Sequence, residues 1–172
     1  MKIISFVFAA LVYSLNLFAA PVITDNHIKI DQFGYRPADR KIAVISNPVT
    51  GYNSSSHYSP GNNFQVRRWS DDAVVYSGTI SAWNGGATHS QSGDKVWWFD
   101  FSTLTAEGTY YIFDITNNAG SYQFDINENV FFNPMKQALR TFYYQRCGIA
   151  KSMPYAQTGW TDAACHKGSL QD

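Results

Sequence analysis

Alternating apolar and polar residues along most of the chain predict a series of short β-strands. In residues 27–31, Ile28 and Ile30 alternate with polar neighbours, as in a strand that buries one face. Residues 41–46 are apolar almost without a break, which is typical of a strand covered on both faces. Further strands with turn signals between them are predicted at residues 64–69, 73–78, 95–101, 110–115 and 121–126.

Loops and turns between these segments indicate how the strands connect. Residues 48–63 and 81–94 are rich in Gly, Ser and Asn, and we expect long loops there. Residues 117–120 carry turn residues, so the last two strands are predicted to pair across them. In the second of these two strands, one face is predicted to carry Tyr122, Phe124 and Ile126.

Leu104, Gly108 and Tyr110 have the spacing of a tyrosine corner, a feature of sandwich folds in which a Tyr hydroxyl bonds to the backbone upstream. Together with about seven short strands, this motif predicts a mainly β protein with the architecture of a β-sandwich. The region contains no cysteine, so an inter-sheet disulfide is not expected.

One helix is predicted after the strands, at residues 133–148. Asn133 suits the capping position, Pro134 suits the first helical residue, and Gly148 suits a left-handed ending. Four apolar side chains recur at helical spacing and form a stripe on this helix: Met135, Ala138, Leu139 and Phe142. A lone helix with an apolar face needs a packing partner.

Composition and charge limit the class of protein. The chain has 172 residues, enough for one domain of ordinary size plus part of another. Its formal net charge is zero, which argues against a nucleic-acid partner. Its twelve Phe, eleven Tyr and five Trp suit both a β-rich exported domain and a surface that handles sugars.

The N-terminal residues predict export. Lys2, the apolar residues 3–18 and the small residues that follow them read as a secretory signal rather than a membrane span. Pro21 disfavours cleavage after Ala20, so we expect residues 1–19 to be removed. The mature protein is expected outside the cell or in the periplasm, with no membrane attachment.

Two cysteines and one histidine form the sharpest group of chemically active residues. Thiolates and an imidazole suit tetrahedral zinc, and Cys147, Cys165 and His166 supply three ligands. Residue types alone favour a disulfide between the two cysteines in an exported protein. The remaining histidines are expected to be surface residues: His27, His57 and His89.

Several aromatic residues have positions that fit a sugar-binding surface. Trp83, Tyr52 and Tyr58 lie in polar loops and are candidates to stack on a sugar ring. Burial is the more usual role of aromatic side chains. Packing in the core or against a neighbouring domain is expected for those on strands: Trp69, Trp97 and Trp98.

Two segments resemble glycoside hydrolase family 9, cellulases that carry an N-terminal immunoglobulin-like domain. Leu139 to Gly148 (LRTFYYQRCG) is similar to the first helix of the catalytic domain, and Ile28 to Pro37 (IKIDQFGYRP) to the first strand of the N-terminal domain. They occur in the family's order. The resemblance implies an immunoglobulin-like sandwich at 20–129 and an incomplete start of an (α/α)6 barrel domain at 130–172.

The resemblance also implies a function. Family members hydrolyse β-1,4-glucan with inversion, which needs an acid and a base on separate carboxylates. Neither the family's Asp-Ala-Gly-Asp motif nor its distant Glu occurs in these 172 residues, so no catalytic residue is assigned and this chain alone is expected to be an inactive monomer. The alternative is a sandwich that binds polysaccharide without cleaving it.

The same resemblance implies a role for the cysteines. In the family, residues at the positions of Cys147, Cys165 and His166 contribute to a structural zinc site, whose fourth ligand is a later histidine. With the resemblance, zinc in the complete enzyme is favoured over the disulfide.

Overall fold

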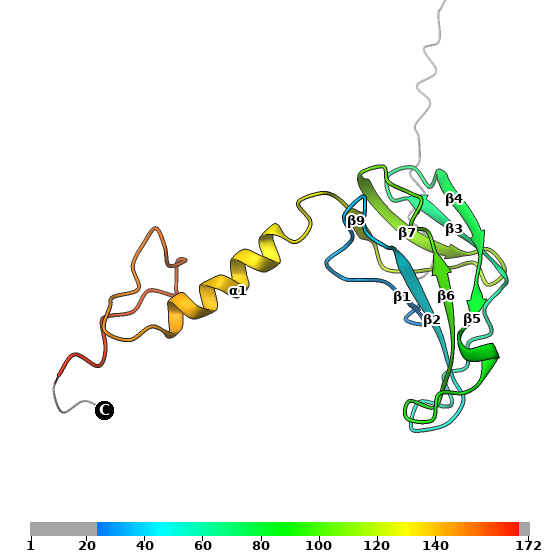
Figure 1. Ribbon diagram of the computed structural model, residues 1–172, viewed down its shortest axis with the longest axis horizontal. Coiled ribbons are helices and arrows are strands. Elements are labelled where there is room, and N and C mark those ends of the chain that lie inside the picture. Colours follow the sequence, from blue (N-terminus) through cyan, green and yellow to red (C-terminus); the bar gives the residue numbers. More distant parts are fainter. Residues whose placement is uncertain (1–23, 169–172) are drawn as a thin grey trace, which may run out of the picture.

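Two antiparallel sheets pack face to face in the computed structural model, which describes residues 24–168 (Figure 1). The first sheet has four strands in the order β1 (Ile28–Lys29), β2 (Ile42–Pro48), β6 (Asp94–Asp100) and β5 (Ser81–Ala82). The second has five, in the order β4 (Val74–Thr79), β3 (Asn63–Arg68), β7 (Gly108–Asp114) and β8 (Ala119–Gly120), with β9 (Phe124–Ile126) also paired to β7. The predicted mainly β sandwich is confirmed.

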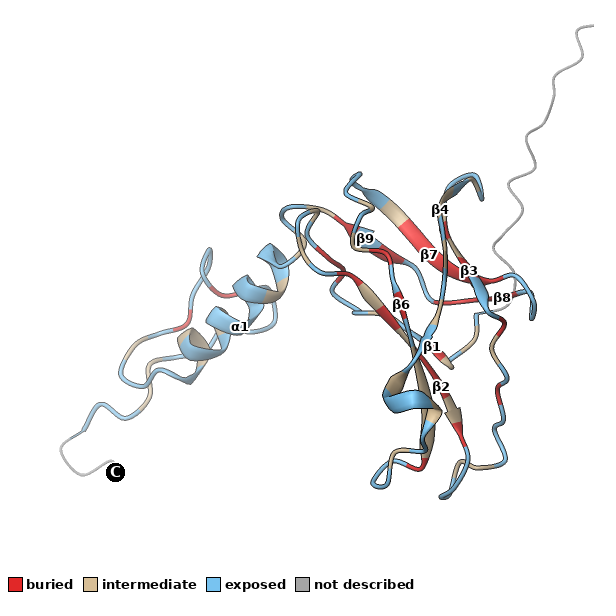
Figure 2. Ribbon diagram, turned by 45° about the vertical axis from the view of Figure 1, so that its right-hand side comes forward, coloured by how far each residue is buried: buried red, intermediate tan, exposed pale blue. Residues whose placement is uncertain are grey.

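The core lies between the sheets and consists mainly of alternate residues from facing strands (Figure 2). Phe64 and Val66 on β3 are fully buried, as their alternation predicts. Phe99 of β6 packs against Phe64, with 5.6 Å between ring centroids, and Phe101 packs against Phe124 at 5.5 Å. Each such side chain contributes about 1.5–3 kcal/mol when fully buried, so these aromatic contacts are the main link between the sheets.

The tyrosine corner is present. The Tyr110 hydroxyl donates a hydrogen bond to the backbone oxygen of Ala106 at 3.1 Å, and the Tyr110 ring is 3% exposed. This bond fixes the loop that enters β7, as the spacing of Leu104, Gly108 and Tyr110 predicts.

Three local predictions in the sandwich are wrong. Residues 81–94 are not only a loop, because they include β5 and a short 3-10 helix, Trp83–Gly86. The first strand is just two residues long, and the chain before it bridges from Thr24 to Gly120 of the other sheet. Tyr122 is 60% exposed and does not share the buried face of Phe124 and Ile126.

The helix forms, but its predicted ends are wrong. Helix α1 spans Phe132–Gln145, so Asn133 lies inside the first turn and Phe131 occupies the capping position without a side-chain hydrogen bond. Arg146 leaves the helix in an extended conformation. Gly148 does adopt a left-handed conformation, with φ of +79°, but lies beyond the end of the helix.

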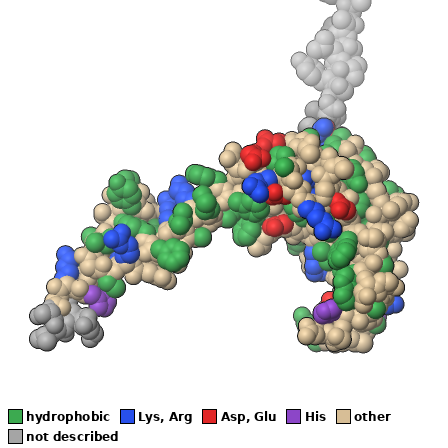
Figure 3. Space-filling model, viewed as in Figure 1, with side chains coloured by type: hydrophobic (Ala, Val, Ile, Leu, Met, Phe, Trp, Pro, Cys, Tyr) green, Lys and Arg blue, Asp and Glu red, His purple; other side chains and the backbone are tan. Residues whose placement is uncertain are grey.

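The apolar stripe on α1 is exposed. Met135, Leu139 and Phe142 are 53%, 60% and 69% exposed, and no residue of α1 is buried. Figures 1 and 2 show the helix projecting from the sandwich, with the C-terminal segment at its far end. Figure 3 shows hydrophobic side chains on the surface of this projecting part of the molecule. No helix within residues 24–168 is long and apolar enough to cross a membrane. The predicted secretory signal, residues 1–19, lies outside the described residues.

Candidate metal centre

The segment after α1 folds back on itself and brings distant residues together. The Gly148 amide donates to the Cys165 carbonyl oxygen at 2.9 Å. Lys151 and Asp162 exchange two backbone hydrogen bonds, at 2.9 and 3.0 Å, as an isolated antiparallel bridge. The positive φ of Gly148, which side chains rarely tolerate, allows the sharp turn that begins this loop.

Tyrosines at the end of α1 hold the returning segment. The Tyr143 hydroxyl accepts a hydrogen bond from the Ser152 amide at 3.3 Å, and the Tyr144 hydroxyl accepts one from the Gln157 amide at 3.0 Å. The Tyr144 ring also contacts Trp160, with 5.7 Å between centroids. The end of the helix therefore supports the loop that carries the cysteines and histidine.

The three predicted metal ligands meet in this loop. One ligand atom from each of Cys147, Cys165 and His166 lies within 4.8 Å of the others. Both cysteines are free thiols in the structure. His166 has a φ of +54°, a conformation that is strained for a residue with a side chain by about 1–3 kcal/mol. Such strain is often found at functional sites.

Lys151 is a further member of the site that the sequence analysis missed. It is 4% exposed, and its Nζ lies 3.9 Å from Cys165 Sγ. The pKa of the Cys165 thiol is lowered, chiefly by a hydrogen bond from His166 and further by the Gly148 amide and the Lys151 ammonium, against the opposing effect of burial. These groups favour the thiolate, the form of cysteine that binds metals.

The donor set fits zinc. Thiolate sulfur and imidazole nitrogen are the usual ligands of structural zinc, at about 2.3 Å and about 2.0–2.1 Å, so ligand atoms in a tetrahedral site lie about 3.5–4 Å apart. The spread of 4.8 Å requires a shift of about 1 Å to reach that geometry. Among residues 24–168, no other group of three His, Cys, Asp or Glu side chains has this proximity. The group supplies three of zinc's four positions.

The other histidines lie away from this centre. His57 is exposed, as predicted, and His89 is half-buried, with its ring edge against Trp83. The expectation that His27 is a plain surface residue is wrong. Its ring is half-buried, bonds to the Asp25 carboxylate at 2.6 Å, and stacks on Tyr58 with 4.9 Å between centroids.

The loop aromatics have different environments from one another. Tyr52 is fully exposed and Trp83 is half-buried, so both remain accessible. Tyr58 is 7% exposed and belongs to the core, which removes it as a sugar-stacking candidate.

Of the aromatics predicted to pack, only Trp97 packs against the core. Trp69 and Trp98 are 38% and 40% exposed and lie outside the core, so for them packing against a neighbouring domain stays a prediction. Trp98 faces outward because successive residues of β6 alternate between the two sides of its sheet.

Comparisons with known proteins agree with this architecture. Residues 24–126 match the family described as the cellulase N-terminal ig-like domain. A cellulose 1,4-beta-cellobiosidase of Acetivibrio thermocellus is 32% identical over 152 residues, which are 86% of this chain and 16% of that protein.

Solved structures give the same result. A metagenome-derived glycoside hydrolase family 9 endoglucanase matches with a TM-score of 0.62 and 33% identity, over 81% of this chain and 24% of its own. A Zn-binding triple mutant of the family 9 endoglucanase J30 matches with a TM-score of 0.59 and 29% identity, over 76% of this chain and 21% of its own. The chain spans less than a quarter of the length of each of these three proteins.

The family match extends over the whole sandwich, from the bridge at Thr24 to the end of β9. The similar structures also continue beyond it, since they cover 76% or more of this chain. The chain therefore belongs to the family of cellulase N-terminal immunoglobulin-like domains, and its similar proteins are glycoside hydrolase family 9 enzymes.

Proposed function

We propose that this chain is the N-terminal part of an exported glycoside hydrolase that cleaves β-1,4-glucan with inversion of configuration. The observation that best supports this is the family match of the whole sandwich, joined to relatives named as a cellobiosidase and an endoglucanase. In this proposal residues 1–19 are the export signal, 20–129 the sandwich, and 130–172 the start of the catalytic domain.

The chain itself is proposed to be inactive. Inversion requires a carboxylic acid and a carboxylate about 6.5–9.5 Å apart, with room for water between them. The neighbouring carboxylates Asp71 and Asp72 instead form ion pairs with two arginines of β3. Asp71 pairs with Arg68 at 2.7 Å and Asp72 with Arg67 at 3.0 Å. Asp114 is fully buried and hydrogen-bonded to protein groups, so substrate has no access to it.

The sandwich is proposed to act as a scaffold for the catalytic domain. The exposed stripe of Met135, Leu139 and Phe142 supports this role, because an apolar helix face of this size in water calls for a packing partner. The apolar faces of further helices in a barrel domain would cover this stripe.

Zinc is proposed as a structural metal of the complete enzyme, held by Cys147, Cys165 and His166. The metal would tie the end of α1 to the returning loop, two segments that meet here through few backbone hydrogen bonds. Lys151 would offset the negative charge of the two thiolates from a nearly buried position.

Metal analysis tests the zinc proposal directly. The reduced product of the complete reading frame, which can supply the fourth ligand, is loaded with zinc, freed of excess metal, and analysed by mass spectrometry for bound zinc. We expect retained zinc to fall at least tenfold in Cys165→Ser and in His166→Ala, and to be unchanged in His57→Ala, a matched control at an exposed loop. Equal zinc retention in all four proteins would contradict the assignment, as would a Cys147–Cys165 disulfide that persists in the zinc-loaded sample.

Hydrolysis is tested on the product of the complete reading frame that contains this chain. Proton NMR of cellopentaose during cleavage shows which anomer appears first. The α-anomer is expected, because inversion of a β-linkage gives it directly. Initial release of the β-anomer would contradict the inverting mechanism, and no cleavage of any β-1,4-glucan would contradict the proposed function.

A further inference from the structure

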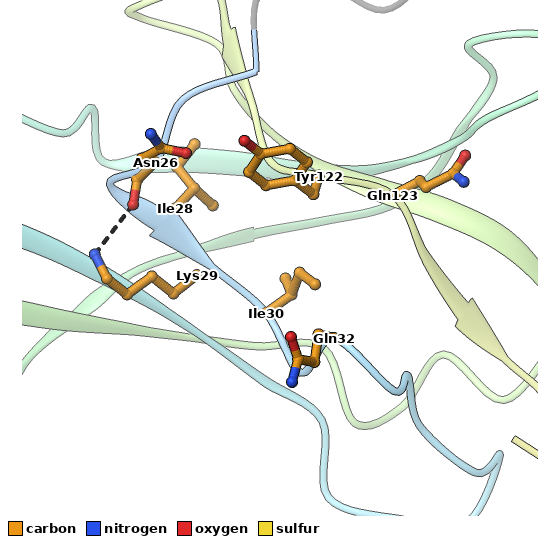
Figure 4. A pocket seen from close by; sticks show the side chains of 7 residues that line it. All are labelled: Asn26, Ile28, Lys29, Ile30, Gln32, Tyr122 and Gln123. Carbon is orange, nitrogen blue, oxygen red and sulfur yellow. Dashed lines mark hydrogen bonds between the residues drawn. The ribbon is translucent and has the colours of Figure 1, made fainter. Parts of the chain in front are cut away.

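A hollow opens at one edge of the sandwich, where the two sheets separate (Figure 4). One side is formed by β1 and the residues next to it, and the other by the segment between β8 and β9. Its volume is ≈ 470 Å³, within the range of about 300–1,000 Å³ that is typical of small-ligand sites. We call it the β1-edge hollow.

Apolar groups form the inner surface of the β1-edge hollow. Ile28 is 2% exposed and lies at its base, with Ile30 beside it. The ring of Tyr122 stands opposite these side chains and is 60% exposed (Figure 4). An accessible aromatic ring next to an aliphatic surface suits a flat ligand with apolar faces.

Neutral polar groups surround this surface. Figure 4 shows Asn26 and Gln32 towards opposite ends of the β1 side, whereas the side chain of Gln123, which follows Tyr122, points away from the apolar surface. Within residues 24–168, no hydrogen-bond partner is present for these three carboxamides or for the Tyr122 hydroxyl. Each carboxamide offers both donors and an acceptor, a combination that matches neighbouring hydroxyl groups.

Charge argues for an uncharged ligand. Lys29 is the one charged residue among the described residues that line the hollow. Its ammonium already bonds to the Asn26 carbonyl oxygen at 3.1 Å and to Ser46 Oγ at 2.6 Å. Successive residues of a strand alternate sides, so Lys29 lies on the other side of β1 from Ile28, and Figure 4 shows its side chain directed away from Tyr122. The lining residues on the Ile28 side are uncharged, which suits a polyhydroxyl compound better than a phosphate or carboxylate.

We propose that the β1-edge hollow binds a neutral oligosaccharide, with the C–H face of one pyranose ring against Tyr122 and its hydroxyls on the carboxamides of Asn26 and Gln32. The choice of β-1,4-linked glucose units as the ligand rests on the proposed function. The site would hold the polysaccharide on the scaffold, apart from any catalytic cleft.

An NMR titration tests this proposal. Cellotetraose is added to the ¹⁵N-labelled mature chain, and amide shifts are followed by heteronuclear correlation spectra. We expect saturable shifts that are concentrated at residues 26–32 and 121–124. Tyr122→Ala should weaken binding at least fivefold, because it removes the stacking surface. Tyr52→Ala is the matched control, since Tyr52 is fully exposed in a different loop, and it should bind like the unaltered chain.

The outcomes distinguish binding at the β1-edge hollow from the proposed glucan hydrolysis. Unchanged spectra, shifts centred on Trp83 instead, or equal binding by Tyr122→Ala would each overturn the proposal. Gln32→Ala gives a second readout if Tyr122→Ala is misfolded, with at least a twofold loss expected. Glucan cleavage by the complete gene product without binding here would reject the hollow alone. Binding here without any cleavage would support the hollow and reject the proposed function.

Discussion

Asp114, the last residue of β7, is a fully buried carboxylate whose loss should strongly destabilise the sandwich. Its Oδ2 accepts hydrogen bonds from the Tyr58 hydroxyl at 2.8 Å, the Gly61 amide at 2.9 Å and Asn117 Nδ2 at 2.7 Å. Its Oδ1 accepts hydrogen bonds from the Thr116 amide at 2.9 Å and the Asn117 amide at 3.3 Å. This carboxylate therefore anchors the long loop after β2 to the end of β7.

The magnitude follows from the donors that Asp114→Ala would leave unpaired. The Tyr58 hydroxyl and the Gly61 amide belong to buried residues, and each unpaired buried donor costs about 1–3 kcal/mol. The donors of Thr116 and Asn117 lie in exposed residues and can bond to water. We therefore expect the free energy of unfolding to fall by about 2–6 kcal/mol, a large share of the about 5–15 kcal/mol that is typical of a domain.

Urea unfolding followed by far-ultraviolet circular dichroism measures this change. The matched control is Asp125→Ala, which removes a surface carboxylate that accepts a hydrogen bond from the Thr109 hydroxyl at 2.7 Å. The control should lose less than about 1 kcal/mol, because both partners can bond to water. In addition, Tyr58→Phe should make Asp114→Ala less harmful, since one unpaired donor is then absent.

The reasoning would be refuted by an Asp114→Ala protein within about 0.5 kcal/mol of the unaltered chain, which is the range of ordinary surface substitutions. Equal losses in Asp114→Ala and Asp125→Ala would refute it as well, because burial would then make no difference.

Three further predictions follow from the sandwich and the helix. Burial and the Asp72 carboxylate raise the pKa of Tyr111 from 10.0 to about 12, and burial and the Asp114 carboxylate also raise the pKa of Tyr58. The stabilisation from these two protonated hydroxyls should therefore be complete below pH 10 and be lost as the pH rises towards 12. Urea midpoints that stay constant from pH 9 to about pH 12 would contradict this prediction. Tyr110→Phe removes the corner hydrogen bond to Ala106 and should lower the free energy of unfolding by about 0.5–1.5 kcal/mol in the same urea assay, whereas no loss would show that the corner is not stabilising. Leu139→Glu should leave the urea midpoint of the sandwich unchanged, because Leu139 is 60% exposed, and a marked decrease would mean that the stripe packs on the sandwich.

Local patterns in the sequence predicted most of the fold because strands and the tyrosine corner depend on neighbours close in the chain. Alternation placed Phe64 and Val66 in the core, and spacing identified the role of Tyr110. The burial of Tyr58 was not predictable in this way. It depends on Asp114, a partner 56 residues away, and nothing in the polar loop around Tyr58 indicates that contact.

The candidate metal centre was predictable only in part. The residue types of Cys147, Cys165 and His166 suggest a metal, but the distance between them in the sequence carries no information on proximity. The resemblance to a family suggested the grouping, and the structure brings the three side chains together. Lys151 was missed because a single lysine has no local sign of burial, and its side-chain partner, Cys165, lies 14 residues away in the sequence.

The helix ends were mispredicted for a related reason. Asn133 and Gly148 have suitable chemistry for the two ends, but tertiary contacts decide where a helix stops. The Gly148 amide bonds to Cys165, and its left-handed conformation serves the turn of the returning loop instead of the helix.

The central claim is that this chain is a scaffold that carries no glucan-cleaving chemistry of its own. The most direct test is the release of reducing sugar from carboxymethylcellulose by the purified chain, with the complete gene product as positive control. We predict no release above buffer from the chain, before or after addition of zinc, and clear release from the control. Release by the chain that increases with its concentration and persists after repeated purification would contradict the claim.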